Sequence, residues 1–422
     1  MSGPTQAGGW GLIAFFNVNP SMVNARAFEV PKTLSLMGGD LEDFCLARLG
    51  GAGTETQVIC VEVYSRVAIL AVSREIRARI SSRHLSERKG GNYTSMKVLV
   101  TGSAGHLGEA LVRTLKDLKH EVIGVDIRAS PFTTEVCSIL DRPCLSGCIS
   151  GVEAVFHTAA LHKPHVVTHS RRDFIDTNII GTLHLLEEAI AAGVKSLVFT
   201  STTSVFGDAL VPPPGAPAVW VTEDVTAIPK NIYGVTKAAA EDLCQLFHRN
   251  HGLACIVLRT SRFFPEVDDN RVVRETYADD NAKANEYLFR RVDIEDVVSA
   301  HVLAAHRAPA IGFCRYIISA TTPFLPDDLR DLRTVGPLVV RRRAPGYEAE
   351  YKRRGWKMFP SIERVYINDR ARNDLGWKPR FDFAAVIESL KAEDDPRSPL
   401  ARIIGSKGYH AEAFAEGPYP VG

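Results

Sequence analysis

The chain has 422 residues, more than one ordinary domain needs, with 45% hydrophobic residues, 23% charged residues and a formal net charge of +1. This balance is typical of a soluble globular protein and does not indicate a nucleic-acid or anionic-membrane partner. No apolar run approaches the roughly 18 residues that a membrane-spanning helix needs. We therefore expect a cytoplasmic protein that acts on a small molecule.

The first 95 residues do not share the pattern of the rest. Gly-rich and polar pieces alternate with short apolar runs, and no basic region precedes the first of these runs, so a secretory signal is not predicted. We interpret residues 1–95 as a poorly ordered extension that activity does not need. Met96 then begins the functional part of the chain.

Residues 96–115 (MKVLVTGSAGHLGEALVRTL) combine a short apolar run, a glycine-rich turn and apolar residues at helical spacing. Gly102, Gly105 and Gly108 are spaced three apart. Such glycines permit a tight turn, a close approach of the backbone to a pyrophosphate, and close packing of the helix on the strand. The free N–H groups at the start of the helix favour phosphate. The stretch predicts the first half of a dinucleotide-binding unit.

Asp126 ends the next apolar run, near the spacing of about 20 residues at which an acidic side chain accepts hydrogen bonds from an adenosine ribose. This position favours NAD over NADP, although Arg128 is placed to contact a 2′-phosphate. NADP stays open as the less favoured cofactor.

Strand-like and helical patterns alternate from Met96 onward, which predicts a parallel sheet covered by helices on both faces. We expect a Rossmann-type doubly wound α/β domain over residues 96–265 and a smaller α/β substrate lobe over 266–390, with 293–318 returning to the first domain and 391–422 as a tail. Expected strands are 97–100, 121–125, 152–156, 196–200, 254–258 and 313–318; expected helices are 109–118, 174–192, 233–249, 293–308 and 383–391. The polar, acidic stretch 268–285 is expected to be a loop over the site.

The eight cysteines are scattered, without a C-x-x-C pair or a histidine at zinc spacing, so no metal site is predicted. We interpret most of them as small core residues of a reduced protein. Cys144 and Cys148 are four apart and fit one helix face, where packing is favoured over a redox or metal pair.

Tyr233 and Lys237 are four apart at the start of an expected helix, so both project from one face. A tyrosine with a pKa near 10 is a poor base at neutral pH, and a neighbouring ammonium group would lower that pKa. The hydroxyl-rich stretch 201–204, which ends the preceding strand, supplies a group to hold a substrate oxygen. Together with the glycine turn, this order predicts a hydride-transfer site.

With these motifs, the sequence resembles the extended short-chain dehydrogenases/reductases, specifically the NAD-dependent sugar epimerase/dehydratase group. The resemblance covers about residues 96–390 and is carried, in order, by TGSAGHLG, FHTAA, TNIIGT, STTSVFG, YGVTK, RTSRFFP, DIEDVVSAH and DLGWKP.

The resemblance implies roles for individual residues. Tyr233 would be the catalytic acid and base, Lys237 would tune it, and Thr202 would be the catalytic hydroxyl. Ser138 departs from the Asp that the family usually has near adenine. The implied cofactor-binding residues are Gly102, Gly105, His106, Leu107, Gly108, Asp126, Ile139, Ala159, Ala160, Asn178, Tyr233 and Lys237.

The reaction implied by the resemblance is hydride transfer through a keto intermediate. Dehydratases of this group carry Asp-Glu after the catalytic Thr, and decarboxylases carry Glu, whereas this chain has Thr203 and Ser204. The first hypothesis is therefore a nucleotide-sugar epimerase, and a homodimer is possible as in many family members. The alternatives are an NAD(P)-dependent alcohol dehydrogenase or ketone reductase on a non-nucleotide substrate, and, less favoured, a non-catalytic dinucleotide-binding protein.

The substrate side departs from the family, because the loop after residue 258 reads RTSRFFP. The candidate substrate contacts are cations and one hydroxyl suited to a carboxylate or phosphate; an exposed polar surface explains the cations as well. These candidates are His162, Lys163, Thr203, Arg262 and Arg343.

Overall fold

The computed structural model describes residues 10–14, 27–31, 95–408, 410 and 414. The chain divides into two units, residues 1–93 and 94–422. In the first unit, β1 (Trp10–Ala14) pairs antiparallel with β2 (Ala27–Pro31). The rest of the expected N-terminal extension lies outside the described residues, so its interpretation stays a prediction.

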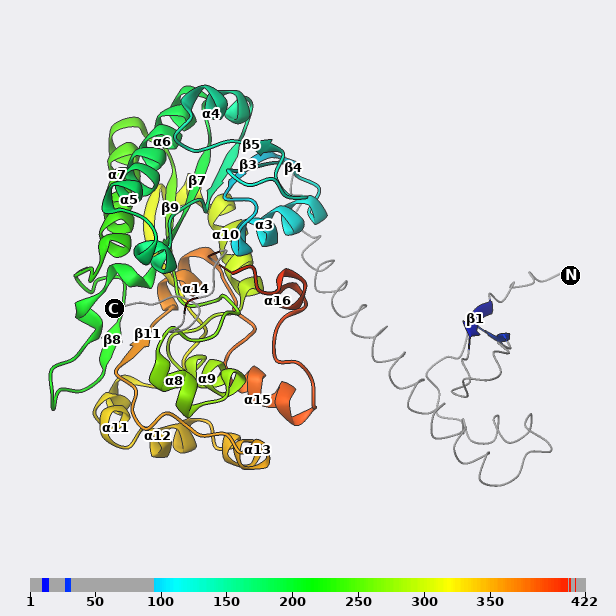
Figure 1. Ribbon diagram of the computed structural model, residues 1–422, viewed down its shortest axis with the longest axis vertical. Helices are drawn as coiled ribbons and strands as arrows, with labels where there is room; N and C mark the ends of the chain where they lie inside the picture. The colour runs from blue at the N-terminus through cyan, green and yellow to red at the C-terminus, as the bar shows by residue number, and fades with distance from the viewer. Residues whose placement is uncertain (1–9, 15–26, 32–94, 409, 411–413, 415–422) are drawn as a thin grey trace, which may run out of the picture. The chain divides into compact units, whose positions relative to one another are not determined.

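A seven-stranded parallel sheet forms the centre of the second unit, in the order β10-β9-β7-β6-β3-β4-β5 (Figure 1). Its inner strands are apolar and buried on both faces, as the continuous apolar runs predicted. This confirms the expected fold class. The strands are β3 (Lys97–Thr101), β4 (Glu121–Asp126), β5 (Glu135–Val136), β6 (Ala154–His157), β7 (Ser196–Thr202), β9 (Cys255–Thr260) and β10 (Phe313–Ile318).

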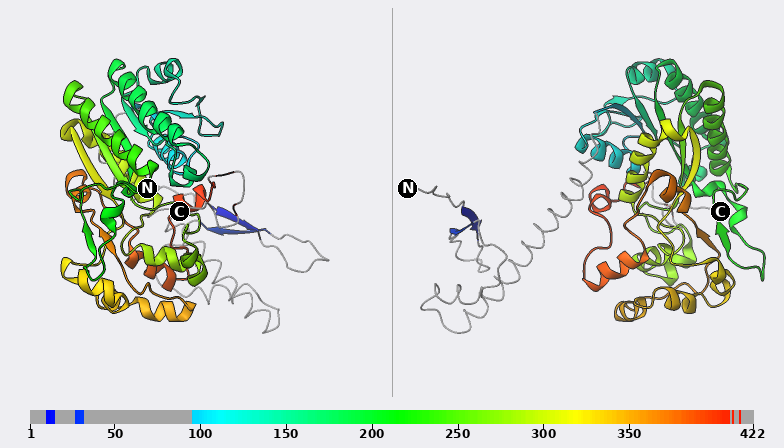
Figure 2. Two further views of the ribbon diagram at one scale, coloured as in Figure 1. Left: turned by 60° about the vertical axis from the view of Figure 1, so that its left-hand side comes forward. Right: turned by 180° about the vertical axis from the view of Figure 1, so that it is seen from behind.

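Helices cover both faces of this sheet, and Figure 2 shows the two layers from other sides. The helices α3 (His106–Asp117) and α10 (Ile294–Ile311) pack on one face, in a core that includes α14 (Asp369–Leu375). The other face packs against α4 (Arg142–Ile149), α6 (Gly181–Ala191) and α7 (Ile232–His251). Chain segments on both faces make the sheet doubly wound.

The expected helix 174–192 is present but not uniform. It consists of α5 (Arg171–Ile175), a π-helical turn η3 (Asp176–Ile180) and α6, and Asn178 lies in the π turn. Such π-helical turns are frequent at functional sites.

The C-terminal lobe contains a small parallel sheet of β8 (Val219–Val221) and β11 (Arg364–Tyr366) with its own apolar core. The helices of this part are α8 (Arg271–Thr276), α9 (Asp279–Glu286), α11 (Leu329–Thr334), α12 (Gly336–Arg343), α13 (Tyr347–Arg354) and α15 (Phe383–Lys391). A last helix, α16 (Pro399–Ile404), follows within the expected tail and packs on α3 and α10.

The prediction of a loop over 268–285 is wrong, because α8 and α9 occupy most of this stretch. The Asn270 side chain caps α8. In α9, Asn281 and Asn285 are buried and both donate to the Lys357 carbonyl. The buried face of α9 is therefore partly polar, and an apolar periodicity cannot reveal it.

The prediction that the cysteines are reduced is wrong for one pair. Cys137 and Cys144 form a disulfide, with their Cα atoms 6.4 Å apart, within the usual range for such a bond. Cys148 is a buried free thiol on α4, as the packing interpretation expected. None of the described helices combines the length and apolar character that a bilayer crossing requires.

Candidate active site

A cleft of about 600 Å³ lies at the carboxyl ends of the parallel strands. The glycine turn forms one wall, and the ends of β4, β6, β7 and β9 form the floor, with the first turn of α7 beside them. Parallel α/β sheets place ligand sites at this edge.

The glycine turn between β3 and α3 leaves no room for a side chain at Gly102 or at Gly108. Gly102 has φ +73°, and a Cβ atom there would lie 2.7 Å from the Ala159 nitrogen. At Gly108 a Cβ atom would lie 1.9 Å from the Gly102 carbonyl oxygen. No side chain caps α3 at its N-cap, Gly105. The turn therefore offers open backbone and a helix N-terminus, which suit a diphosphate.

Asp126 lies where the sequence predicted a ribose contact. Its carboxylate is buried at the end of β4 and accepts hydrogen bonds from the backbone N–H of Ala104 (2.9 Å) and of Arg128 (2.9 Å). It thereby ties the glycine turn to the neighbouring strand end. Ile139 and Ser138 line the same end of the cleft.

Asn178 lies behind the cleft wall and does not line it. Its amide group donates to the Leu161 carbonyl and to Thr236 Oγ1, and its Oδ1 accepts from the Leu161 N–H. The residue that was expected to bind cofactor therefore joins the segment after β6 to α7. Ala159 and Ala160 of that segment do line the cleft.

Thr202, Tyr233 and Lys237 come together in the cleft, as the sequence predicted. Thr202 ends β7, and α7 begins at Ile232 with Asn231 as its N-cap, so the tyrosine lies on the first helical turn. All three side chains are less than a tenth exposed. Thr202 hydrogen-bonds to Tyr233.

The pKa of Tyr233 is raised to about 12, because burial disfavours the phenolate and the hydrogen bond to Thr202 offsets only part of that effect. The expectation that Lys237 lowers this pKa is thus not met by the structure. Burial also lowers the pKa of Lys237 to about 7, against the opposing charge of Glu241. Its Nζ lies 3.8 Å from the centre of the Phe199 ring.

Four of the five predicted substrate residues line the cleft: His162, Lys163, Thr203 and Arg262. The His162 ring lies 6.0 Å from the Tyr233 ring, and burial lowers the pKa of this histidine to about 3. Lys163 Nζ lies 2.6 Å from Asp269 Oδ2. Arg262 is held by Asp268, Asp269 and Glu286.

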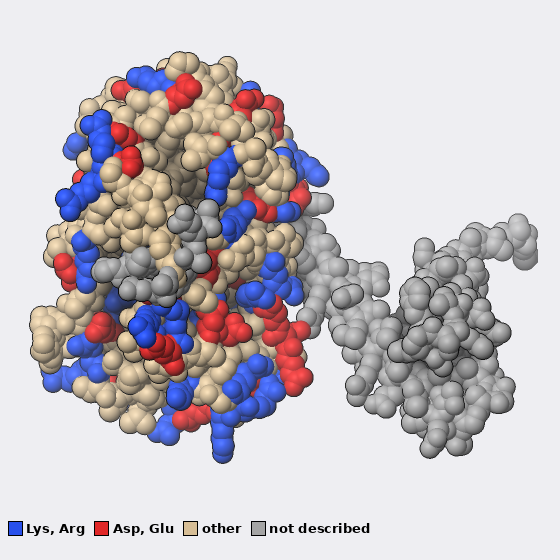
Figure 3. Space-filling model, viewed as in Figure 1, with Lys and Arg blue, Asp and Glu red and all other residues tan. Residues whose placement is uncertain are grey.

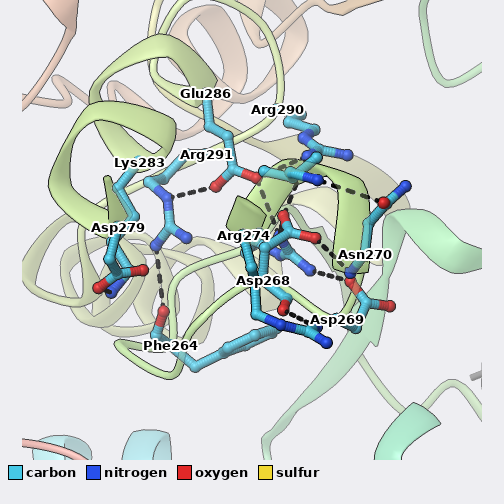
Figure 4. Close-up of polar contacts among 12 residues, drawn as sticks. Phe264, Asp268, Asp269, Asn270, Arg274, Asp279, Lys283, Glu286, Arg290 and Arg291 are labelled. Carbon is cyan, nitrogen blue, oxygen red and sulfur yellow. Dashed lines mark hydrogen bonds and ion pairs between the residues drawn. The ribbon is translucent and has the colours of Figure 1, made fainter. Parts of the chain in front are cut away.

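Arg262, which follows β9 and lines the cleft, belongs to a buried ionic cluster with Asp268, Asp269 and Glu286. Figure 4 shows these three carboxylates together with Arg290 and Arg291. Glu286 receives Arg290 and Arg291, each at 2.7 Å, in addition to Arg262. Burial would raise the pKa of Glu286, but the three guanidinium groups hold it well below its usual range.

Two arginines that the sequence analysis did not select also line the cleft, Arg290 and Arg364. The Nε atom of each is buried and has no hydrogen-bond acceptor among the described residues. They lie close enough that Arg364 lowers the pKa of Arg290, although burial lowers it more. The adjacent arginines Arg290 and Arg291, just before the expected helix 293–308, are a sequence feature that could have indicated a site residue. No sequence feature indicates Arg364, which lies on the short strand β11.

Arg343 is not at this site, which corrects its prediction as a substrate contact. It lines a separate cavity of about 370 Å³ in the C-terminal lobe, and its guanidinium binds Asp328 at 2.7 and 3.1 Å.

Figure 3 shows Lys and Arg mixed with Asp and Glu over one face of the molecule. Among the described residues no group of three His, Cys, Asp or Glu side chains forms a metal site.

Comparison with known proteins agrees with this architecture. Residues 98–312 match the family described as the NAD dependent epimerase/dehydratase family. A UDP-glucose 4-epimerase of Streptomyces lividans is 26% identical over 334 residues, covering 70% of this chain and 95% of that protein. A 3-beta-hydroxysteroid dehydrogenase of Mycolicibacterium neoaurum is 26% identical over 337 residues, covering 68% and 87%. For two other relatives, the chain spans only 55% and 63% of their length.

A UDP-N-acetylglucosamine 4-epimerase structure from Bacillus cereus has the same fold, with a TM-score of 0.51, 18% identity and coverage of 71% of this chain and 99% of that one. The family match spans more than half of the chain, so this protein belongs to the NAD dependent epimerase/dehydratase family. The family predicted from the motifs is confirmed.

Proposed function

We propose that this protein is an NAD-dependent epimerase that acts on a nucleotide sugar. The supporting observation is the position of Arg290 and Arg364, whose side chains line the cleft and whose buried Nε atoms have no acceptor within the described part of the chain. Lys163 and Arg262 line the same part of the cleft, where both already pair with Asp269. A diphosphate would supply the missing acceptors.

The opposite end of the cleft fits NAD. The open backbone from Gly102 to Gly108 and the N-terminus of α3 would hold the pyrophosphate. Asp126 would contact the adenosine ribose and disfavour a 2′-phosphate. When bound, NAD would supply a hydride acceptor and donor.

The residues of the chain would move the proton and orient the sugar. In the first half-reaction the phenolate of Tyr233 would take the proton of the reacting hydroxyl, and in the second half-reaction the protonated tyrosine would return it. The Thr202 hydroxyl would hold the reacting oxygen by a hydrogen bond. Lys237, which also lines the cleft, would bind the nicotinamide ribose.

A reaction assay with a panel of nucleotide sugars, read by NMR, tests this proposal. We expect an epimerised sugar to appear without net formation of NADH. Net NADH formation from a free alcohol, with all nucleotide sugars unchanged, would contradict it.

That second outcome defines the other candidate, an alcohol dehydrogenase or ketone reductase. Phe263 and Phe264 line the cleft and give it an apolar portion that a nucleotide sugar does not require. The similarity to a 3-beta-hydroxysteroid dehydrogenase supports the same alternative.

A further inference from the structure

The C-terminal part of the chain returns to the glycine turn. Ser398, buried, caps α16 through its Oγ and donates its backbone N–H to Asp293 Oδ2. Ile404, at the end of α16, is buried in the core shared with α3 and α10. Residues 405–408 follow this anchored helix and lie at the mouth of the cleft. We call them the C-terminal clasp.

One carboxylate oxygen holds the clasp. Glu266 Oε1 accepts hydrogen bonds from Ser406 Oγ (2.8 Å) and from the backbone N–H groups of Lys407 and Gly408 (both 3.1 Å). His106 Nε2 lies 2.9 Å from the same oxygen. Burial alone would raise the pKa of Glu266, but His106 and Ser406 outweigh it and hold the pKa at about 2. The carboxylate therefore stays charged through the neutral range.

His106 is the first residue of α3, within the glycine turn. The contacts of Glu266 therefore join the clasp to the expected pyrophosphate site. Lys407 adds a second link, because its Nζ lies 2.5 Å from Glu109 Oε2 on the first turn of α3. Lys407 and Gly408 line the cleft together with Gly105 and His106.

The chain reaches the opposite wall two residues later. His410 Nε2 donates to the Pro164 carbonyl (2.9 Å), in the short helix η2 (Lys163–Val167) that follows β6. The His410 ring also lies 5.6 Å from the His165 ring. The described residues around the clasp thus contact both sides of the cleft, at the pyrophosphate end and beside His162.

We propose that the C-terminal clasp is an additional wall of the dinucleotide site and that Glu266 is the positioning residue that keeps the bound dinucleotide from leaving between turnovers. The inference rests on the proposed cofactor but not on the identity of the substrate. Departure of the dinucleotide past this wall would require breaking the hydrogen bonds at Glu266 and the ion pair of Lys407. An epimerase, which re-uses its hydride, gains from such retention.

The test measures the release of NADH from the full-length protein. NADH is bound, an excess of NAD is added in a stopped-flow instrument, and the loss of NADH fluorescence gives the release rate. We expect Glu266→Gln to release NADH about tenfold faster or more, and Lys407→Ala to release it several-fold faster. Glu266→Asp, which keeps the charge, should lie between Glu266→Gln and the wild type.

Asp328→Asn is the matched control, because Asp328 is also a buried carboxylate that holds a loop through Arg342, Arg343 and the Leu325 N–H, but away from the cleft. It should alter the melting temperature and leave the release rate unchanged. If NADH release were unchanged in both Glu266→Gln and Lys407→Ala, the proposed role of the clasp would be wrong and the proposed function would stand. If the wild type bound no NADH, the role of the clasp and the proposed function would both be wrong.

Discussion

Tyr233 is the residue on which the proposed chemistry depends most directly. Replacing it with phenylalanine keeps the buried ring and removes the group that exchanges a proton with the substrate. We expect Tyr233→Phe to lower kcat by about 10²–10⁴-fold, the usual contribution of general acid–base catalysis. The affinity for NADH, measured by fluorescence titration, should stay within a few-fold of the wild type.

Tyr287→Phe is the control for that substitution, since Tyr287 is equally buried but does not line the cleft. Its kcat should match the wild type. Turnover that survived in Tyr233→Phe at the control level would show that the tyrosine takes no part in the chemistry.

A second prediction at the residue scale concerns Lys237 and the free energy of unfolding rather than activity. Its folded pKa of about 7 lies below its ordinary value of 10.5, so the folded protein disfavours the ammonium form. Below pH 7 the lysine is protonated in both the folded and the unfolded chain, and the full cost of burying the charge applies. Between pH 7 and 10.5 the folded state has lost the proton and the unfolded state has not, so this cost falls as the pH rises.

Lys237→Met removes the charge and keeps the length of the side chain. We expect it to raise the free energy of unfolding at pH 6, since one pKa unit corresponds to about 1.4 kcal/mol. The difference from the wild type should shrink steadily from pH 7 to pH 10, as measured by urea unfolding at each pH. A difference that is constant over this range would show that Lys237 is not destabilised by burial.

At the scale of elements, the glycine turn makes the sharpest prediction. A methyl group at Gly108 would overlap the Gly102 carbonyl, which belongs to the turn itself, so the backbone would have to move. We expect Gly108→Ala to cost several kcal/mol of unfolding free energy or to abolish NADH binding. Thermal unfolding and NADH titration check the two effects separately.

Gly147 provides the matched control, because it lies inside α4 and a Cβ atom there would meet no other atom within 4 Å. Alanine is the better helix former, so Gly147→Ala should stabilise the protein by about 0.5–1 kcal/mol. Equal effects of the two substitutions would mean that the close contact at Gly108 is absent in solution.

Local patterns predicted the elements whose apolar residues follow one period, and missed those held together by polar pairing. Tyr233 and Lys237 lie about one helix turn apart, and the three glycines lie at one turn of the chain. The sequence alone therefore predicts that the members of each set lie close together. The helix α9 was missed because Asn281, Asn285 and Glu286 are buried among polar partners. A polar stretch is predicted to be a loop when the hydrogen-bond partners of its buried side chains lie far away in the chain.

At the scale of the whole molecule, contacts between distant segments explain which site residues the sequence does not predict. The motifs identified the family and the cofactor half of the cleft, since both depend on contiguous residues. Arg364 enters the cleft from the C-terminal lobe, and Lys407 contacts His106, which lies 301 residues earlier in the chain. Such contacts depend on how elements pack, and no local pattern records them.

The last prediction concerns residues 1–94. The contacts of Ser95 and Met96 lie within the second unit: Ser95 Oγ donates to the Lys119 carbonyl, and the Met96 N–H donates to His120 Nδ1. Met96 also packs against the core beside α3. We therefore expect a chain that begins at Ser95 to fold with an unchanged melting temperature and to keep the NADH affinity and turnover of the full-length protein.

A chain that begins at Val98 is the informative comparison, because it loses both hydrogen bonds and the first residue of β3 while differing by only three residues. It should melt at a lower temperature, since β3 lies inside the sheet between β6 and β4 and its first pairings would be missing. If the chain from Ser95 were insoluble or inactive, the first 94 residues would be part of the functional protein, and the boundary at Met96 would be wrong. If both truncated chains behaved alike, the contacts of Ser95 and Met96 would not be what fixes the start of the domain.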